Sequence, residues 1–550
     1  MALSHNMFPV DRRTLLQLAA VGTAALAAGP LAAATLFGTG FTHGVASGEP
    51  GPDQILLWTR FVSTGDEAKL GFELAESGSF ARIVARGEAI AGAATDWCAK
   101  VVAKGLEPGR WYYYRFIGPG GEVSAIGRTR TLPVGHAARF RMALFSCSNI
   151  GFGYFNAYAH AAASGEFDLA VHLGDYTYEY PRGEYPSASQ TAPGRLVVPV
   201  NETVNLTDYR LRQAAYRADP DLQALFQACP MVLMWDDHET ANDSWKGGAE
   251  NHQPTREGDW GQRSAAAIRA YREWLPVSDA DWASYDIGDL ATLWRLESRL
   301  TARDLQLDLK GLAAKAAPGQ MEQALTAFRQ GAWQEPSRTL LGARQEAWLA
   351  DTLKASVQQG KVWQVIAQQV VMGRLAMPDA VLPGLGADKP DYLKFQLKAY
   401  TAAAHVDLPY NMDAWDGYPA ARDRLLGAAQ AADANLIVFS GDSHNAWAFD
   451  LDRGEKPVGV EFGATSVTCP GNEGTIAWMK PTDLARATVK RNPQLKWCDM
   501  AGRGYCAVEL TRGHASCEYR FTAPVSTRSA RLTGMHRVSV LPGRRRLGTG

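Results

Sequence analysis

Two patterns of hydrophobic and polar residues divide the chain at about residue 135. Up to that point, short runs rich in β-branched and aromatic residues, such as 54–61 and 110–118, are separated by turns with glycine or proline. This spacing is typical of a β-sandwich. From Arg139 on, short apolar runs alternate with longer amphipathic segments, which predicts an α/β domain with a mixed sheet.

The second pattern resolves into individual elements. Short apolar runs predict strands at 139–146, 168–173, 231–235, 361–371 and 435–440. Amphipathic or alanine-rich segments predict helices at 154–164, 221–229, 263–275, 343–356 and 420–432. The stretches 461–468 and 504–522 are typical of closing β structure. We therefore expect four parts: an N-terminal leader at 1–34, an immunoglobulin- or fibronectin III-like β-sandwich at 39–133, an α/β domain at 138–525 and a tail at 526–550.

The leader has the pattern of an export signal. The pair Arg12-Arg13 stands directly before a weakly apolar stretch rich in alanine and glycine that reaches Ala34. This arrangement resembles a twin-arginine signal peptide, which the twin-arginine export machinery reads as an address. The alternative is an arginine pair before an ordinary helix. The first interpretation predicts a periplasmic or secreted protein that folds, often with its metal, before export.

Composition narrows the classes of partner. The chain has 550 residues, 46% of them hydrophobic and 21% charged, with a formal net charge of −1. Such a balance offers no electrostatic basis for binding nucleic acid or an anionic membrane. After the N-terminal segment no apolar run is long enough to predict a membrane span.

Seven cysteines leave at least one thiol unpaired if the others oxidise. Cys506 and Cys517 flank a predicted turn at Arg512-Gly513 and could face each other across a hairpin. A disulfide between them and two free thiols are both open at this stage, because a chain that folds before export does not need disulfides.

Four predicted strands end in side chains that can bind metal. The residues concerned are Cys147 after the first strand, Asp175 and Tyr178 after the second, Asp236, Asp237 and His238 after the third, and Asp442 and His444 after the last. Ligands of open α/β sheets gather outside the carboxyl ends of the strands. Taken alone, each has a simpler explanation: a buried cysteine, or a Gly-Asp turn. The run "WDDHE" is harder to explain without a cation, and four such ends together predict one shared site. His172, inside its strand, is interpreted as a core histidine.

These residues carry a resemblance. The segments "FTHGVASGEP", "ILLWTR", "FSCSN", "HLGDYTYEY", "WDDHE", "NMDAWDGYP" and "FSGDSHN" make the chain similar to the PhoD-like alkaline phosphatases, within the calcineurin-like and purple acid phosphatase superfamily of metallophosphoesterases. The similarity runs from about residue 41 to 520. It implies an αββα metallophosphoesterase sandwich at 138–525, preceded by the β-sandwich domain.

The resemblance also implies the ligands of two metal sites. An iron(III) ion (Fe3+) would be held by Cys147, Asp175, Tyr178 and His444. Asp175 would bridge to calcium (Ca2+), whose other oxygen ligands would be Asp237, Asp442 and Asn242. The first motif departs from the superfamily, because Cys147-Ser148-Asn149 stands where Asp-x-His is usual. That departure matches the PhoD-like group and weakens any inference from iron–zinc enzymes.

The implied activity is hydrolysis of phosphate monoesters, diesters or both, by attack of a metal-activated hydroxide. His238 would act as the general acid toward the leaving group. Trp415 and Tyr418 would either shape the pocket or simply pack. The sequence does not decide between monoester and diester.

The rival interpretation is a secreted serine ester hydrolase with Ser443 as nucleophile. It requires a base, and His444 is too close in sequence to reach Ser443 easily. Alternate residues of an extended segment face opposite sides, so Ser443 should point away from the site that Asp442 and His444 share.

Overall fold

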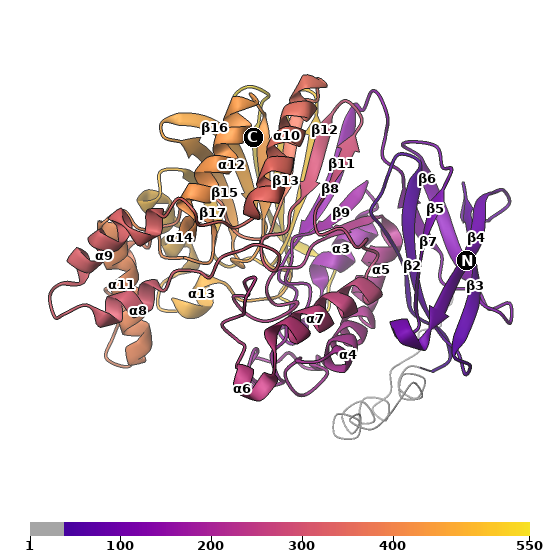
Figure 1. The fold of residues 1–550 in the computed structure, drawn as a ribbon, viewed down its shortest axis with the longest axis horizontal. Coiled ribbons are helices and arrows are strands. Elements are labelled where there is room, and N and C mark those ends of the chain that lie inside the picture. Colours follow the sequence, from indigo (N-terminus) through magenta and orange to yellow (C-terminus); the bar gives the residue numbers. More distant parts are fainter. Residues whose placement is uncertain (1–37, 550) are drawn as a thin grey trace.

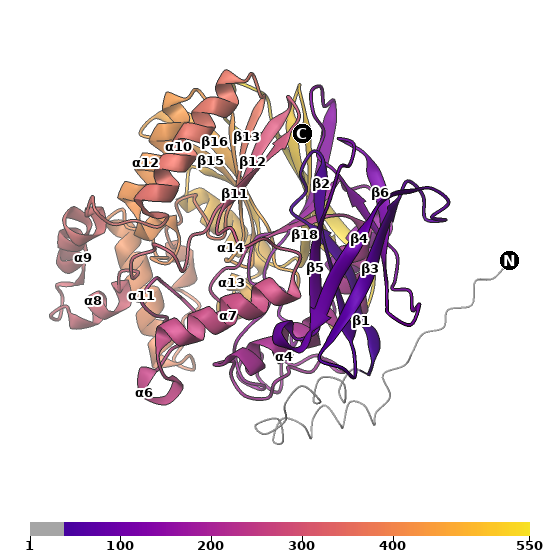
Figure 2. The same ribbon diagram turned by 45° about the vertical axis from the view of Figure 1, so that its right-hand side comes forward.

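The N-terminal part is a β-sandwich. The computed structural model describes residues 38–549 (Figure 1), so the predicted leader and its Arg12-Arg13 pair lie outside the described residues. One layer is antiparallel and contains β1 (Gly40–Gly48), β2 (Gln54–Val62) and β5 (Cys98–Lys104). The other, seen at the right of Figure 2, contains β4 (Ile83–Gly92), β3 (Glu67–Ala75), β6 (Trp111–Ile117) and β7 (Gly127–Arg130). In β6, buried and half-buried side chains alternate strictly, so every second residue enters the core between the layers.

The first layer continues into the sheet of the α/β part. Gly48 of β1 pairs in parallel with Met231 of β10 (Met231–Leu233). A Cβ atom on Gly48 would lie 2.2 Å from the carbonyl oxygen of Pro276 and 2.8 Å from that of Met231. Only glycine therefore lets β1 approach β10 this closely. The resulting sheet has ten strands in the order β21-β20-β19-β18-β8-β9-β10-β1-β2-β5.

A second sheet of seven strands faces the first. Its order is β11 (Ala283–Ile287), β12 (Ala291–Arg295), β13 (Trp363–Ala367), β14 (Leu436–Ser440), β16 (Lys456–Gly463), β15 (Ala446–Arg453) and β17 (Leu495–Asp499). The neighbours β12, β13, β14 and β16 run parallel. Val171 and Leu144 from the large sheet pack with Ile437 and Val365 from this one in a single buried cluster.

Helices cover both outer faces (Figure 1). The ten-stranded sheet is covered by α3 (Asn156–Ser164), α4 (Leu206–Arg217), α5 (Pro220–Ala228) and α7 (Trp260–Trp274). The seven-stranded sheet is covered by α10 (Gly342–Gln358), α12 (Pro419–Ala431) and α14 (Pro481–Arg491). Several helices begin at a capping side chain. Asp219 accepts hydrogen bonds from two main-chain N–H groups of α5, and Pro220 is the first residue of that helix. This is the αββα sandwich that the sequence predicted.

A small helical extension with its own core stands beside the second sheet, at the left of Figure 1. It contains α8 (Leu309–Lys315), α9 (Met321–Gln330), the short turn η3 (Ala332–Gln334) and α11 (Asp391–His405). Two one-turn helices, α6 (Pro254–Glu257) and α13 (Asn472–Thr475), lie elsewhere on loops.

The C-terminal strands β18 (Gly504–Thr511) and β19 (Ala515–Thr522) form the expected hairpin beside β8 (Arg139–Phe145). Cys506 pairs in register with Tyr519, not with Cys517, and both thiols are free. The disulfide left open by the sequence is therefore absent. Past residue 525, β20 (Leu532–Val540) and β21 (Gly548–Thr549) extend the same sheet.

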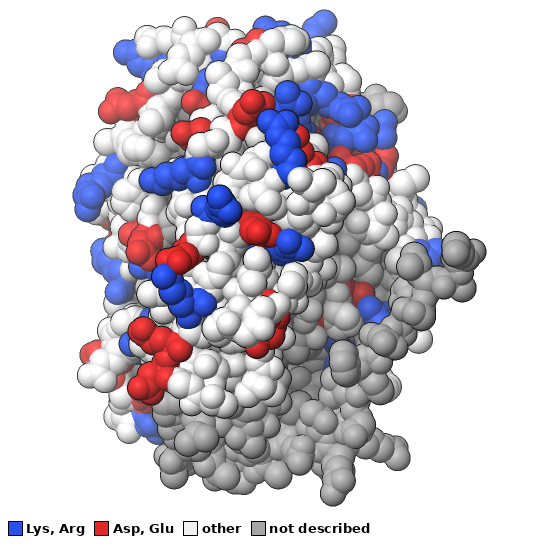
Figure 3. Space-filling view, turned by 90° about the vertical axis from the view of Figure 1, so that its right-hand side faces the viewer, with Lys and Arg blue, Asp and Glu red and all other residues white. Residues whose placement is uncertain are grey.

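The face of the N-terminal strands carries both signs of charge. On its described part, Lys and Arg side chains are interspersed with Asp and Glu (Figure 3), and Lys69 pairs with Glu88 at 2.7 Å. Within residues 38–549, no helix is long and apolar enough to cross a membrane.

Candidate metal centre

The predicted ligands lie where parallel strands of both sheets end. Cys147 follows β8, Asp175 follows β9 (Leu169–His172) and Asp237 follows β10, while Asp442 and His444 follow β14. Strands β8, β9 and β10 are parallel neighbours in the large sheet, and β14 lies in the facing sheet. The carboxyl ends of both sheets thus meet at one edge of the sandwich.

Sharp backbone turns bring these side chains together. Cys147, Asp175, Asp442 and His444 all have left-handed backbone conformations, with φ between 56° and 64°. Such a conformation costs about 1–3 kcal/mol for a residue other than glycine, and it persists where surrounding structure enforces it. Four strained residues at four predicted ligands indicate a functional cluster.

Two glycines allow the strand ends to approach each other. A Cβ atom on Gly174 would lie 2.5 Å from the Cβ of Asp236. One on Gly441 would lie 2.1 Å from the hydroxyl oxygen of Ser146. The glycine of each Gly-Asp pair is therefore needed for close contact between neighbouring strand ends, and the aspartate follows it into the site.

Candidate ligand atoms form three overlapping groups. Within each group the atoms lie no more than 4.8 Å apart, and the groups are Cys147, Asp175 and His444; Asp175, Asp237 and His238; and Asp236, Asp237 and Asp442. Asp175 and Asp237 each belong to two groups. Such sharing is the geometry expected when carboxylates bridge adjacent cations.

The hydroxyl of Tyr178 lies inside the first group. It donates to Oδ2 of Asp175 at 2.8 Å and lies 3.4 Å from Nε2 of His444. The Cys469 thiol donates to the same hydroxyl at 3.1 Å. Burial, then the charge of Asp175, raises the pKa of Tyr178 well above its usual value. The oxygen would become a phenolate only beside a strong cation.

Unpaired oxygens show that the cluster fits a metal. Oδ1 of Asp175, Oδ2 of Asp236 and Oδ1 of Asp237 are buried, and none has a hydrogen-bond partner within the described residues. Burying polar atoms of this kind without a hydrogen bond is costly. A thiol, a phenol, an imidazole and carboxylate oxygens in one place form a donor set for metal ions.

One buried arginine, Arg299, neutralises part of the negative charge of the carboxylates in the cluster. The guanidinium of Arg299 contacts four carboxylates: Asp236, Asp413 at 2.7 Å, Asp237 at 3.5 Å and Asp442 at 3.6 Å. Burial raises the pKa of Asp442 well above its usual value, and the charge of Asp236 adds to the effect. Burial would also raise the pKa of Asp237, but Arg299 and His238 lower it. Carboxylates still outnumber this arginine, which leaves negative charge for a further cation.

His238 is held at the rim of the second group. Its Nδ1 lies 2.8 Å from Oε2 of Glu179, and its ring lies 4.3 Å from that of Tyr178, centre to centre. Burial alone would lower its pKa, but the charges of Asp237 and Glu179 raise it well above the usual value. The imidazole is therefore held as a proton donor.

Asn242 lies beside this pair. Its main-chain N–H donates to Oε1 of Glu179 at 2.7 Å, and its side-chain amide donates to Glu250 at 3.1 Å. Asn242 thus fixes the carboxylate that holds His238.

Ser443 points away from the cluster, as predicted, but the backbone around it turns at Asp442 and His444 and is not the extended segment that the prediction assumed. Its hydroxyl accepts from the indole N–H of Trp447 at 2.6 Å, and within the described residues no histidine nitrogen lies within hydrogen-bonding distance of it. Trp415 and Tyr418 are fully buried, with hydrogen bonds to Gln368 and to the carbonyl of Asp304, so both pack in the interior. His172 is likewise buried and lies 2.9 Å from the hydroxyl of Tyr158.

Sequence reasoning missed several residues of the cluster, namely Glu179, Arg299, Asp413 and Cys469. One signal was available for Arg299. It follows β12, which runs parallel to β13 and β14, so its carboxyl end had to lie at the same edge of the sheet as Asp442.

Comparison with known proteins agrees with this geometry. The family model described as "PhoD-like phosphatase" matches residues 142–519, and that of its N-terminal domain matches residues 27–133. The chain belongs to the PhoD-like phosphatase family. Alkaline phosphatase D of Bacillus subtilis (strain 168) is 32% identical over 536 residues, covering 91% of this chain and 82% of that protein.

Solved structures extend the comparison. One described as the structure of PhoD has 30% identity and a TM-score of 0.74, covering 93% of this chain and 92% of that one. A purple acid phosphatase, PPD1 from yellow lupin (Lupinus luteus) seeds, has 12% identity and a TM-score of 0.52, covering 91% and 75%. At that identity the second match shows the fold alone. The protein is thus a PhoD-like, metal-dependent phosphoric ester hydrolase with the metallophosphoesterase fold.

Proposed function

We propose that this PhoD-like enzyme is exported and releases phosphate from monoesters, diesters or both at a centre that contains iron and calcium. One observation carries the proposal. Cys147, Asp175 and His444, with the hydroxyl of Tyr178 among them, share Asp175 with the neighbouring carboxylates. This is the arrangement of two adjoining cation sites.

The donor types support the identity of the metals. Thiolate, phenolate, imidazole and carboxylate around Asp175 suit iron(III), whereas Asp237 and Asp442 offer oxygen alone, which suits calcium. Bound ions would neutralise the phosphate oxygens and lower the pKa of a coordinated water toward about 7. The bond from Asn242 to Glu250 uses Nδ2, so Oδ1 of Asn242 is the atom that would bind calcium.

We assign the general acid to His238. Nδ1 of His238 is hydrogen-bonded to Glu179, so Nε2 is the nitrogen that can donate a proton to the leaving oxygen. The Tyr178 ring packs against the imidazole at a tilt of 31°, which restricts the plane of the imidazole. Glu179 raises the pKa of His238 and would favour the protonated ring when Asp237 binds a cation.

Exposure favours one direction of substrate approach. The side chains of Asp442 and His444 are 18% and 17% exposed, against 2% for Asp175. A phosphate ester would therefore meet Asp442, His444 and His238 first, with Asp175 behind them.

Elemental analysis of the exported protein, run beside hydrolysis of p-nitrophenyl phosphate and bis(p-nitrophenyl) phosphate, tests the metals and the substrate class together. We expect iron and calcium, and loss of both activities on chelation. Zinc without iron would overturn the metal assignment. Activity that survives chelation and falls with a serine-directed phosphonate would return the serine-hydrolase alternative.

Export is tested separately. Replacing Arg12-Arg13 by two lysines should leave the precursor in the cytoplasm, because the arginine pair is the address that the twin-arginine machinery reads. The matched control replaces the surface residues Arg82 and Arg86 by lysine, which should leave export unchanged. Periplasmic or secreted enzyme from the Arg12-Arg13 variant would show that another route is used.

A further inference from the structure

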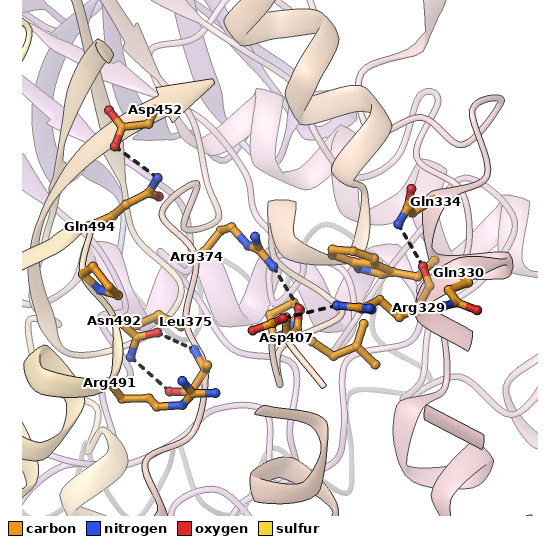
Figure 4. A pocket seen from close by; sticks show the side chains of 15 residues that line it. Arg329, Gln330, Gln334, Arg374, Leu375, Asp407, Asp452, Arg491, Asn492 and Gln494 are labelled. Carbon is orange, nitrogen blue, oxygen red and sulfur yellow. Dashed lines mark hydrogen bonds and ion pairs between the residues drawn. The ribbon is translucent and has the colours of Figure 1, made fainter. Parts of the chain in front are cut away.

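A cavity of about 770 Å³ lies between the helical extension and the second sheet (Figure 4). Four short segments and one strand residue line it: 329–334 from α9 and η3, 374–376, 407–409, 491–494 and Asp452 of β15. None of the residues assigned to the metal centre is among them. Its volume falls within the range of about 300–1,000 Å³ that is usual for small-molecule sites.

Three arginines from separate segments face this cavity (Figure 4). Arg329 pairs with Asp407 at 3.2 Å. Within the described residues, neither Arg374 nor Arg491 has a carboxylate at ion-pairing distance. Each donates instead to a main-chain carbonyl, that of Asp407 at 3.1 Å for Arg374 and that of Ala404 for Arg491.

Those two positive charges are not compensated from within the cavity. Asp407 is already paired with Arg329, and Asp452 is paired with Arg546 at 3.0 Å. A carbonyl oxygen accepts a hydrogen bond but carries no net charge. Arg374 and Arg491 therefore keep their charge and further N–H donors for an anion.

The rest of the wall is preorganised and partly apolar. The amide of Asn492 is fixed by two hydrogen bonds to the main chain of Ala376, at 2.7 and 3.0 Å. The guanidinium of Arg374 lies 5.6 Å from the ring centre of Trp333. Leu408 and Pro409 lie buried behind the cavity, and Trp333, 7% exposed, is the apolar ring at its wall. Apolar walls with a few convergent polar groups are typical of sites for small organic ligands.

We propose that this cavity binds a phosphate-type oxyanion carried on a small organic group, at a site separate from the metal centre. Arg374 and Arg491 bind the oxyanion, since the planar guanidinium matches phosphate oxygens two at a time. Trp333 contacts the organic group.

One segment joins the two sites. Asp407 and Pro409 line the cavity, and Asp413, four positions after Pro409, pairs with Arg299. An anion in the cavity would thus contact a segment that ends at the metal centre.

Calorimetric titration of the metal-loaded enzyme with phenylphosphonate, which has no ester bond to hydrolyse, tests the site. We expect two binding events in the natural protein. The double variant Arg374→Gln, Arg491→Gln should lose one of them, with its affinity falling at least tenfold, and should hydrolyse p-nitrophenyl phosphate within about twofold of the natural rate. The control Arg531→Gln removes an exposed arginine elsewhere and should keep both events.

A second variant keeps every arginine in place. Gln330→Glu adds a carboxylate at the exposed edge of the cavity and should weaken the same event. A single event in the natural protein, or unchanged titrations for both the double variant and Gln330→Glu, would overturn the proposal. Inorganic phosphate should bind in the cavity more weakly than phenylphosphonate, and equal affinity of the two would exclude the role given to Trp333.

Discussion

The hydroxyl of Tyr178 donates a hydrogen bond to Oδ2 of Asp175 at 2.8 Å. Tyr178 stands three positions after Asp175, and the loop after β9 returns the phenol to the carboxylate that two of the ligand groups share. The proton between the two oxygens must leave if both bind one metal. Burial and the charge of Asp175 hold that proton in place without a cation, so loss of the proton reports on the metal.

Replacing Tyr178 by phenylalanine should remove the visible absorption of the iron-loaded enzyme. Phenolate bound to iron(III) gives a charge-transfer band, and the variant keeps the ring but not the oxygen. We expect loss or shift of the band and a fall in iron content, measured by absorption and elemental analysis. Tyr185→Phe is the control. The ring centre of Tyr185 lies 5.8 Å from that of Tyr178, and its hydroxyl is not among the candidate ligand atoms. An unchanged band in Tyr178→Phe would exclude the phenol as a ligand.

The turn after β14 predicts unequal roles for three consecutive residues. Asp442→Ala and His444→Ala should each lower kcat/KM at least a hundredfold, since both side chains belong to ligand groups. Ser443→Ala should stay within about fivefold of the natural enzyme, because its hydroxyl accepts a hydrogen bond from Trp447 and points away from the ligand groups. Steady-state kinetics on one ester compares the three. Equal loss in Ser443→Ala and Asp442→Ala would favour a serine nucleophile.

Arg299→Met should make the stability of the protein depend strongly on calcium. Without the guanidinium, the buried Asp236 and Asp237 and the partly exposed Asp442 lose the cation that they share, at a cost of about 3–5 kcal/mol in the metal-free protein, whereas Asp413 keeps its pair with Arg303. Added calcium should raise the melting temperature of Arg299→Met by more than it raises that of the natural protein.

The matched control for this prediction is Arg263→Met. Arg263 is also fully buried and pairs with Glu202 and Glu257, outside the three ligand groups. Arg263→Met should lower the melting temperature, and calcium should shift it no more than it shifts that of the natural protein. Melting curves with and without calcium decide, and equal calcium shifts in the two variants would contradict the role of Arg299.

Local patterns predicted most elements around the centre. The strand expected at 435–440 is β14, Leu436–Ser440. All of its residues are buried, as the apolar run predicted. The helix expected at 263–275 is α7, which begins earlier, at Trp260, since Asp259 caps its first turn. The β structure expected at 461–468 ends at Gly463. Beyond it, Val467 and Thr468 donate to the carbonyls of Ser146 and Cys147, and this contact with the metal centre replaces strand pairing.

Pairing across long sequence distances was not predictable in the same way. Arg299 and Asp413 are 114 positions apart and meet only because β12 and the segment after α11 reach the same edge of the sandwich. A single sequence carries no sign of that contact. The ligands, by contrast, each stand directly after an apolar strand, so their position was visible one strand at a time.

Asp416, away from the metal centre, should make the protein less stable as the pH rises. Burial raises its pKa from 3.8 to about 6, against the smaller opposing effects of Arg374 and the N–H of Leu375. The folded state therefore holds this proton more tightly than the unfolded chain does. The stability that the protonated carboxyl contributes is fully present below about pH 4, and it is lost as the pH rises to 6 and beyond.

Asp416→Asn should remove that dependence. The amide stays neutral at every pH and keeps an oxygen that can accept from Leu375, as Oδ2 of Asp416 does at 2.9 Å. A shift of about two units corresponds to about 3 kcal/mol at most, so the variant should be more stable than the natural protein at pH 8 by up to that amount. At pH 4 the difference should vanish. Asp423→Asn is the control, because Arg453 lowers the pKa of that surface carboxyl and its replacement should bring no gain at pH 8. Urea unfolding at both pH values, with metal content held constant, measures the difference, and a gain for Asp416→Asn of equal size at pH 4 and pH 8 would show that the carboxyl does not titrate between them.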